Sequence, residues 1–202
     1  GGAGGRIAAR IVASAPADGQ TVGIGGANNL VLAGLLGRDI GYDPTRDFTF
    51  ICAVARVPFA IAIRASLPIH SIEELVGYAR ANPGKLTFGS AGVGGSSHLA
   101  VEAVAQHFQL ELLHIPFRGS SLATNEVVAD RIDLVATDVN RVLPLAKAGK
   151  VRLLAATGAA RVKSAPNLAT LHEQGLTGFH LDPWYGLYGP KGLDGAIVAR
   201  WQ

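Results

Sequence analysis

Apolar and polar positions alternate most regularly between residues 86 and 156. Short apolar runs, typical of strands, are separated there by segments with apolar residues every three or four positions, which are typical of helices. Strands are expected at 86–89, 112–115, 134–137 and 151–156, and helices at 96–108, 122–129 and 142–148. Because strands and helices follow each other in turn, the pattern predicts βαβ units and a parallel sheet.

Further elements are expected on both sides of this region. Helical spacing predicts helices over 7–15, 30–36, 72–81 and 195–201, and apolar runs predict strands over 21–25, 50–63 and 184–189. Asn28 or Asn29 is expected to cap the second of these helices and Ser71 the third. Their side-chain oxygens can accept hydrogen bonds from amides of the first helical turn.

Two apolar segments predict how the chain divides into domains. Residues 50–63 contain Pro58, which lacks a backbone N–H and therefore fits an edge or crossing strand better than a central one. Together with residues 184–189, they are expected to form two crossovers between a first and a second domain. The expected division is 1–64 for part of the first domain, 65–180 for the second, and 181–202 for the return crossover and the start of the remaining first domain.

The most informative stretch is the loop after the expected strand at 86–89. Residues 89–98 read Gly-Ser-Ala-Gly-Val-Gly-Gly-Ser-Ser-His and run directly into a helix. Amide N–H groups at a helix N-terminus have no partner inside the helix and carry partial positive charge. Glycine lets a ligand approach the backbone, and serine adds hydroxyl donors. The loop is therefore expected to bind a small anion, either a carboxylate or a phosphate; a flexible connection is the alternative.

Nucleotide-binding motifs fit this loop poorly. Gly89 and the run Gly94-Gly95-Ser96 have the spacing of a Walker loop, but the lysine that contacts the β- and γ-phosphates is missing. A dinucleotide fingerprint needs a third glycine that the sequence does not supply in place. Nucleotides are therefore weak candidates as ligands.

Other loops at expected strand ends also carry polar side chains. Ser120 or Ser121 is expected to cap the helix at 122–129, and the same geometry would give a second anion-binding helix end. Arg118 would either pair with a carboxylate or point to solvent. Asp138 would either cap the next helix or accept a hydrogen bond from a ligand. Ligands of parallel sheets bind beyond the carboxyl ends of the strands, where these loops lie.

His98 has three possible roles: it faces a ligand, caps its helix, or serves only the structure. A nucleophilic pair with Ser97 is disfavoured, because adjacent residues on a helix do not face each other. The chain also lacks a Gly-x-Ser-x-Gly nucleophile elbow. No catalytic residue is assigned. An α/β hydrolase or transferase that uses Ser96 or Ser97 with His98 is kept as the alternative to a binding protein.

Composition narrows the classes of partner. The chain has 202 residues, of which 49% are hydrophobic and 16% charged, so a well-filled core is expected. The net charge is +3 and no two Lys or Arg residues are adjacent, so no nucleic-acid surface is expected. The single cysteine, Cys52, is expected to be a buried thiol. The dispersed histidines predict no metal site.

Several short motifs, in a fixed order along the whole chain, resemble one protein family. They are Gly-Ala-Gly-Gly at 2–5, Ala17-Asp-Gly-Gln-Thr21, Tyr42-Asp-Pro44, Pro83-Gly-Lys-Leu86, the run 89–100, His114-Ile-Pro-Phe-Arg-Gly-Ser120, Ala148-Gly-Lys-Val-Arg152 and Trp184-Tyr-Gly-Leu187. Together they resemble the tripartite tricarboxylate transporter substrate-binding proteins, also called the Bug (Bordetella uptake gene) family.

The resemblance implies a fold and a function. The fold would be α/β and similar to type II periplasmic binding proteins, with two βα domains joined by two crossover strands. The first domain would be incomplete, because family members begin earlier with a strand and loop and continue through C-terminal helices. The resemblance implies a monomeric periplasmic receptor, without enzymatic activity or cofactor, that closes around a small carboxylate or dicarboxylate. It would deliver this ligand to membrane permease subunits; a sensor subunit is a close variant.

The resemblance also implies which residues contact the ligand. In the family, backbone amides and hydroxyls of domain loops hold the carboxylate, partly through ordered waters. The corresponding positions are Ala27, Asn28, Ser90, Ala91, Gly92, Ser96, Ser97, His98, Ser120 and Asp138. Family members usually have an Asp-Asn pair where this chain has Asp138-Val139-Asn140, which leaves the role of Asn140 open.

Overall fold

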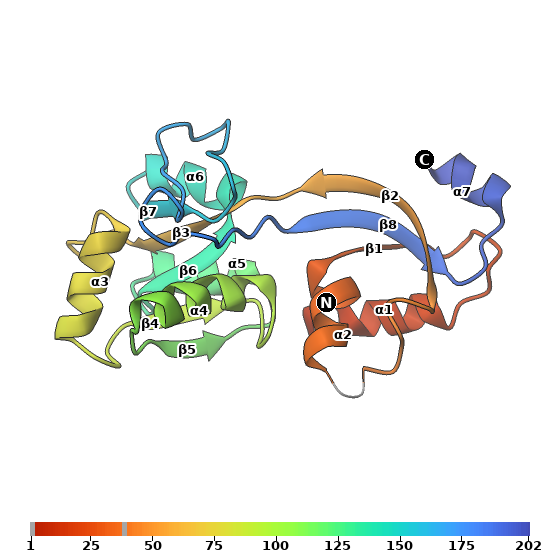
Figure 1. Ribbon diagram of the computed structural model, residues 1–202, viewed down its shortest axis with the longest axis horizontal. Coiled ribbons are helices and arrows are strands. Elements are labelled where there is room, and N and C mark those ends of the chain that lie inside the picture. Colours follow the sequence, from red (N-terminus) through yellow and green to blue (C-terminus); the bar gives the residue numbers. More distant parts are fainter. Residues whose placement is uncertain (1–2, 38–39) are drawn as a thin grey trace. The chain divides into compact units, whose positions relative to one another are not determined.

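The computed structural model describes residues 3–37 and 40–202, which fall into two compact units (Figure 1). One unit combines the chain up to Arg56 with the chain from Pro183 onward, and the other is Val57–Asp182. The backbone therefore passes between the units twice. The first passage lies before residues 59–64 and not after them, because these residues form a strand in the sheet of the second unit.

The first unit is built on an antiparallel sheet with the strand order β1–β8–β2. Its elements are η1 (Ala3–Gly5), α1 (Arg6–Ala13), β1 (Gly23–Gly26), the π-helical turn η2 (Asn28–Leu32), α2 (Ala33–Leu36), β2 (Phe48–Arg56), β8 (Trp184–Pro190) and α7 (Gly195–Trp201). Its core contains Ala9, Val12, Leu30, Phe48 and Tyr188. The rings of Phe48 and Tyr188 meet edge to face at 4.9 Å.

Two local expectations for this unit are wrong. The helical segment starts at Asn28, with Ala27 at the N-cap position, so neither asparagine is the capping residue. The side chain of Asn29 instead accepts a hydrogen bond from the Gly26 amide at 3.0 Å, across the turn that follows β1. Cys52 is half-buried and not part of the core, because it lies on β2 at the edge of the sheet.

The second unit is a five-stranded sheet in the order β5–β4–β6–β3–β7. Its elements are β3 (Phe59–Arg64), α3 (Ile72–Ala81), β4 (Thr87–Ser90), α4 (Ser96–Phe108), β5 (Leu113–Pro116), α5 (Ser120–Val128), β6 (Leu134–Asp138), α6 (Val139–Lys147) and β7 (Val151–Ala156). The predicted cap of α3 is confirmed, because the Glu74 amide donates to the Ser71 hydroxyl at 3.1 Å.

The expectation of a purely parallel sheet is wrong at β3. This strand lies between β6 and β7 and is antiparallel to both, whereas β4 is parallel to β5 and β6. Pro58 precedes β3, so its missing N–H removes no hydrogen bond from the ladder; its carbonyl accepts from the Val139 amide at 3.0 Å. The buried run from Phe59 to Ile63 therefore occupies a central position.

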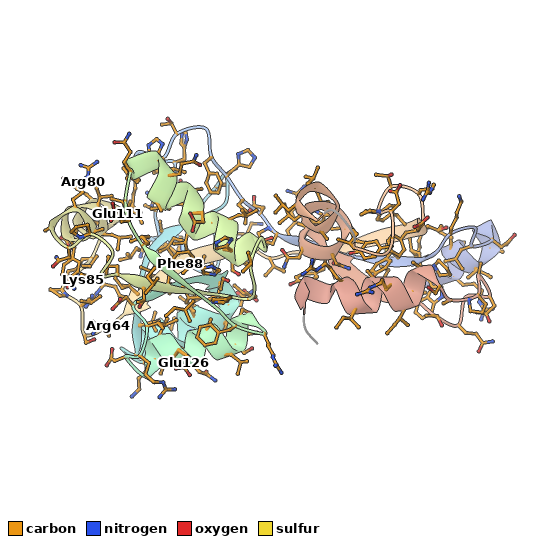
Figure 2. All side chains as sticks on the ribbon, turned by 90° about the horizontal axis from the view of Figure 1, so that it is seen from below. Arg64, Arg80, Lys85, Phe88, Glu111 and Glu126 are labelled. Carbon is orange, nitrogen blue, oxygen red and sulfur yellow. The ribbon has the colours of Figure 1, made fainter. Side chains whose placement is uncertain are left out.

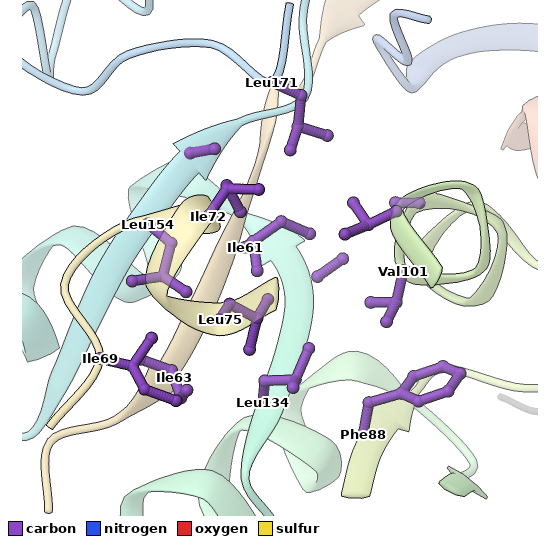
Figure 3. Packing of buried hydrophobic residues seen from close by; sticks show 14 of the residues in the cluster. Ile61, Ile63, Ile69, Ile72, Leu75, Phe88, Val101, Leu134, Leu154 and Leu171 are labelled. Atoms are coloured by element: carbon purple, nitrogen blue, oxygen red, sulfur yellow. The ribbon is translucent and has the colours of Figure 1, made fainter. Parts of the chain in front are cut away.

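The alternation of side chains along β3 separates two cores. Ile61 and Ile63 pack with residues of α3 and α4, while Ala60 and Ala62 pack with residues of α5 and α6. Figure 3 shows the first of these cores, in which Phe88 of β4 lies beside Val101 of α4. The sheet is thus covered by helices on both faces, as expected for an α/β unit. Within the described parts of the chain, no helix is long and apolar enough to cross a bilayer.

Candidate functional site

The polar loops of the second unit lie together at the carboxyl ends of its parallel strands. β4 pairs in parallel with β5 and β6, so the carboxyl ends of these three strands lie together. Ser90 is the last residue of β4 and Asp138 the last of β6, and Ser120 begins the helix that follows β5. The structure therefore brings these three predicted site residues to the same end of the sheet, where the strands finish and where ligands of such sheets bind.

The loop between β4 and α4 is closed by hydrogen bonds to side chains at its own two ends. The Ala91 amide donates to Ser97 Oγ at 2.9 Å, the Gly92 amide to Ser90 Oγ at 3.1 Å, and the Gly94 amide to His98 Nδ1 at 3.1 Å. Gly92 and Gly94 have φ angles of 132° and 74°, which side chains other than glycine rarely tolerate. The loop is therefore fixed by its sequence and not merely flexible.

These bonds change the roles expected for the serines. Ser90, Ser96 and Ser97 are buried, at 0%, 2% and 3% exposure. The hydroxyls of Ser90 and Ser97 accept loop amides, so they shape the loop whether or not they also contact a ligand. What the loop leads into is the N-terminus of α4, a helix of 13 residues with no side-chain cap. First-turn amides of such a helix have no helical acceptor and favour a negative charge.

His114 of β5 belongs to this site and was not predicted. Its Nε2 lies 2.6 Å from Ser90 Oγ, and its ring stacks on His98 at 4.0 Å and on Phe88 at 4.7 Å between centroids. The sequence does hold a signal, a lone polar residue within the apolar run 112–115. Its partner was not evident, because the pairing of His114 with Phe88 depends on the register of β4 and β5.

The environment of His114 keeps its ring neutral. Burial, assisted by the neighbouring His98 ring, lowers the pKa of His114 from 6.5 to about 4. A neutral imidazole offers one acceptor nitrogen and one donor nitrogen. At neutral pH the ring can therefore accept a hydrogen bond from the Ser90 hydroxyl.

This lowered pKa predicts a loss of stability at acidic pH. The unfolded chain binds a proton at His114 below pH 6.5, whereas the folded chain resists it down to about pH 4. The contribution of His114 to stability is therefore complete above pH 6.5 and is lost as the pH falls from 6.5 towards 4. Melting temperatures over this range should fall less steeply in His114→Phe than in the wild type. Equal slopes for the two proteins would contradict the assignment.

His98 is engaged through both of its ring nitrogens. Nδ1 accepts the Gly94 amide, and Nε2 lies 3.4 Å from Glu102 Oε1, one helical turn further on. The ring therefore closes the loop but does not cap α4, because the amide that it accepts belongs to Gly94, before the N-cap residue Gly95. With its acceptor nitrogen occupied, it is not placed to take a proton from Ser97, whose Oγ binds the Ala91 amide instead.

Ser120 and Asp138 differ in whether they cap the helix that follows them. α5 begins two residues before the expected start, with Gly119 at the N-cap and Ser120 as its first residue, so the expectation that Ser120 or Ser121 caps the helix is wrong. Asp138 does cap α6, because its Oδ1 accepts the Asn140 amide at 2.8 Å. Capping was one of the two roles expected for Asp138. Arg118 is exposed.

Two predicted site residues lie in the first unit. Ala27 and Asn28 are both half-buried and occupy the turn from β1 into η2. Behind them, the Asn29 side chain binds the Gly26 amide and the Tyr188 hydroxyl, and Tyr42 donates to the Asn29 carbonyl at 2.6 Å. These bonds fix the backbone of this turn.

The second unit also has an open groove of about 600 Å³. It is lined mainly by apolar residues of α6, β7 and the segment 164–168, and it contains Arg152. The Arg152 guanidinium donates to the carbonyls of Leu67 and Ile69 at 2.7 and 2.9 Å, so these donors are already used. The Arg152 guanidinium is thus already engaged with the backbone, whereas Lys147 also lines the groove. Among residues 3–37 and 40–202, no group of three His, Cys, Asp or Glu side chains is arranged to hold a metal.

Comparison with known proteins identifies relatives along the whole chain. A family model described as "Tripartite tricarboxylate transporter family receptor" matches residues 1–202. The "UPF0065 protein in tcbD-tcbE intergenic region" of Pseudomonas sp. (strain P51) is 38% identical over 200 residues, which are 98% of this chain and 59% of that protein. The chain thus spans less than two thirds of this relative's length.

Solved structures agree with this match. The structure described as "R. palustris Rpa4515 with adipate" superposes with a TM-score of 0.93 at 34% identity, covering 97% of this chain and 66% of that one. The "periplasmic binding protein BugD" gives a TM-score of 0.92 at 33% identity, covering 99% and 67%. The α/β fold described above is therefore the periplasmic binding protein fold of these proteins.

Proposed function

Because this chain belongs to the tripartite tricarboxylate transporter receptor family, whose members are solute-binding proteins and not enzymes, we propose that it captures a small dicarboxylate in the periplasm. Closure of the two units around the ligand is the proposed mode of capture. The proposed next step is delivery of the ligand to permease subunits in the membrane. The similarity to a protein whose structure contains adipate, a linear diacid, supports this choice of ligand class.

The observation that carries the proposal is the pre-shaped loop at the start of α4. No Lys or Arg occurs between residues 86 and 101, so the positive charge that this loop itself offers comes from the helix terminus. Hydrogen bonds from amides to an ionised carboxylate contribute about 1.5–3 kcal/mol each. A site of this kind binds an anion through amide hydrogen bonds whose directions the loop fixes. Such binding is reversible, as a receptor that must release its ligand requires.

We assign different roles to the residues of this site. The first-turn amides of Ser97 and His98 are proposed to bind one carboxylate of the ligand. Ala91 and Gly92 are proposed to support them, since their amides are already bonded within the loop. Ser96, Ser120 and Asp138 are proposed to line the site at the same end of the sheet. Ala27 and Asn28 are proposed to contact the ligand from the first unit.

Ligand binding is the first test of this function. Adipate should raise the melting temperature and bind in a calorimetric titration without being consumed, because binding to the folded state alone stabilises it. Hexanoate has the same length with a single carboxylate and should bind at least about tenfold more weakly. Equal binding of the two acids would reject the dicarboxylate. Absence of binding by any small acid, together with turnover of an ester, would favour the hydrolase alternative.

The Ser97→Ala variant tests the place of binding. Loss of the hydroxyl leaves the Ala91 amide without its acceptor and loosens the α4 N-terminus. Adipate affinity should fall about tenfold, the equivalent of one hydrogen bond. Ser121→Ala is the matched control, since this serine is exposed on α5, and it should bind adipate like the wild type. Equal affinity of both variants would remove Ser97 from the proposed site.

A further inference from the structure

Three aromatic rings form a stack directly behind the loop that leads into α4. Phe88 and His114 lie 4.7 Å apart, His98 and His114 4.0 Å apart, and Phe88 and His98 5.9 Å apart, with interplanar angles of 22°, 27° and 12°. Figure 2 places Phe88 inside the unit, with Arg80, Lys85, Glu111 and Glu126 towards its periphery. The rings come from β4, β5 and α4, so they join the three elements that carry the loop.

The two imidazoles of this stack hold opposite ends of the loop. His114 Nε2 contacts Ser90 Oγ at 2.6 Å, where β4 ends, and His98 Nδ1 accepts the Gly94 amide at 3.1 Å, just before α4 begins. His114 contacts the His98 ring face to face, so a change at His114 reaches both ends.

The direction of the single Ser90 hydroxyl proton decides which hydrogen bonds this side chain donates and accepts. The Ser90 hydroxyl has a single proton and two acceptors within reach, His114 Nε2 at 2.6 Å and the Gly92 carbonyl at 3.2 Å. In the arrangement that we infer, the hydroxyl donates to His114 Nε2 over the shorter contact, and the ring carries its own proton on Nδ1. Ser90 Oγ is thereby oriented to accept the Gly92 amide at 3.1 Å.

We propose that His114 is the positioning residue of the carboxylate-binding loop, acting through Ser90 at one end and through His98 at the other. This inference rests on the proposed function of the loop. His114 itself does not bind the ligand in this account. It fixes the direction of the Ser90 hydroxyl and the plane of the His98 ring, and these two side chains set the backbone of residues 91–95.

Burial and the neighbouring His98 ring keep His114 neutral. On α4, the titratable neighbours are His98 and Glu102, and the Glu102 carboxylate lies 3.4 Å from Nε2 of His98. β4 contributes Phe88 and Ser90, which carry no charge. A proton added to Nε2 of His114 would turn this acceptor into a donor, and the Ser90 hydroxyl would have to turn away.

Two substitutions at His114 separate positioning from packing. His114→Gln keeps an amide oxygen that can accept from Ser90, whereas His114→Phe keeps an aromatic ring but has no acceptor. Adipate affinity at neutral pH should fall about tenfold in His114→Phe and by less, about threefold, in His114→Gln, which keeps the acceptor for Ser90 but loses the flat face against His98. His107→Gln, an exposed histidine at the far end of α4, is the matched control and should leave affinity unchanged. Equal losses in both His114 variants, or no loss in either, would overturn the proposal.

A second readout needs no ligand. Nitrogen NMR of the ligand-free protein should show His114 protonated on Nδ1 and unprotonated on Nε2 at neutral pH, and the Gly92 and Gly94 amide signals should move in His114→Phe but not in His107→Gln. A proton on Nε2, or amide signals unmoved in His114→Phe, would contradict the positioning role. If adipate does not bind the wild type, the proposed function fails, while these signals still decide the role of His114.

Discussion

Replacing Phe88 with alanine is expected to lower the free energy of unfolding by about 4 kcal/mol, a cost typical of truncating a buried aromatic ring. The ring has 0% exposure and packs in the larger core of the second unit. Its loss leaves a cavity that the neighbouring side chains fill only in part. Because the same ring stacks on His98 and His114, adipate binding should weaken as well. Denaturant unfolding and calorimetric titration of the variant measure the two effects.

The matched comparison for Phe88 is its replacement by leucine. Leucine fills most of the volume and should restore more than half of the stability, but it offers no flat face to the two imidazoles. Affinity should therefore recover less than stability does. Full recovery of both quantities in Phe88→Leu would show that the stack has no part in shaping the loop.

Asp133→Ala is expected to cost about 3 kcal/mol, because breaking a largely buried ion pair leaves charged and polar groups without partners. The Asp133 carboxylate accepts Arg64 Nε at 2.7 Å on one oxygen, and the Thr87 amide and hydroxyl at 2.7 and 2.9 Å on the other. Its side chain is 13% exposed. These bonds join the end of β3 and the start of β4 to the residue before β6.

Asp130 provides the control for this prediction. It also faces Arg64, but at 3.9 Å and with a side chain that is 55% exposed, so this pair contributes little. Asp130→Asn should change the free energy of unfolding by less than about 1 kcal/mol. Asp133 lies just before the start of β6, at the opposite end of the strands from the loop at 91–95. Asp133→Ala should therefore leave the adipate affinity of the folded protein unchanged. A small cost for Asp133→Ala, equal to that of Asp130→Asn, would contradict the account.

Local periodicity was sufficient to predict most elements of the second unit. α4 and β7 have the predicted bounds, because a short apolar run and a helical face are properties of neighbouring residues. The position of β3 was wrong because it depends on partners 75 and 94 residues away, since the register pairs Ile61 with Ala136 and Ala155. Pro58 suggested an edge or a crossing strand; β3 begins one residue later, and the chain passes from one unit to the other between Arg56 and Val57.

In the candidate site, too, residues close together in the sequence were predicted and a residue brought in by strand pairing was not. Ser90, Ser97 and His98 were predicted because they are close in sequence and lie where a strand turns into a helix. His114 was missed because only the pairing of β4 with β5 brings it to Ser90. The sequence also left open whether a serine hydroxyl serves a ligand or the loop. The structure shows loop amides bound to Ser90 and Ser97.

The most direct test of the central claim, that the α4 N-terminus binds a carboxylate, is an amide NMR titration with adipate. The largest shifts should occur at Ser97 and His98, with smaller ones at Ala91 and Gly92. Hexanoate at the same concentration should produce weaker shifts at the same amides. Shifts confined to the groove around Arg152, or a spectrum of the folded protein that adipate does not change, would contradict the account.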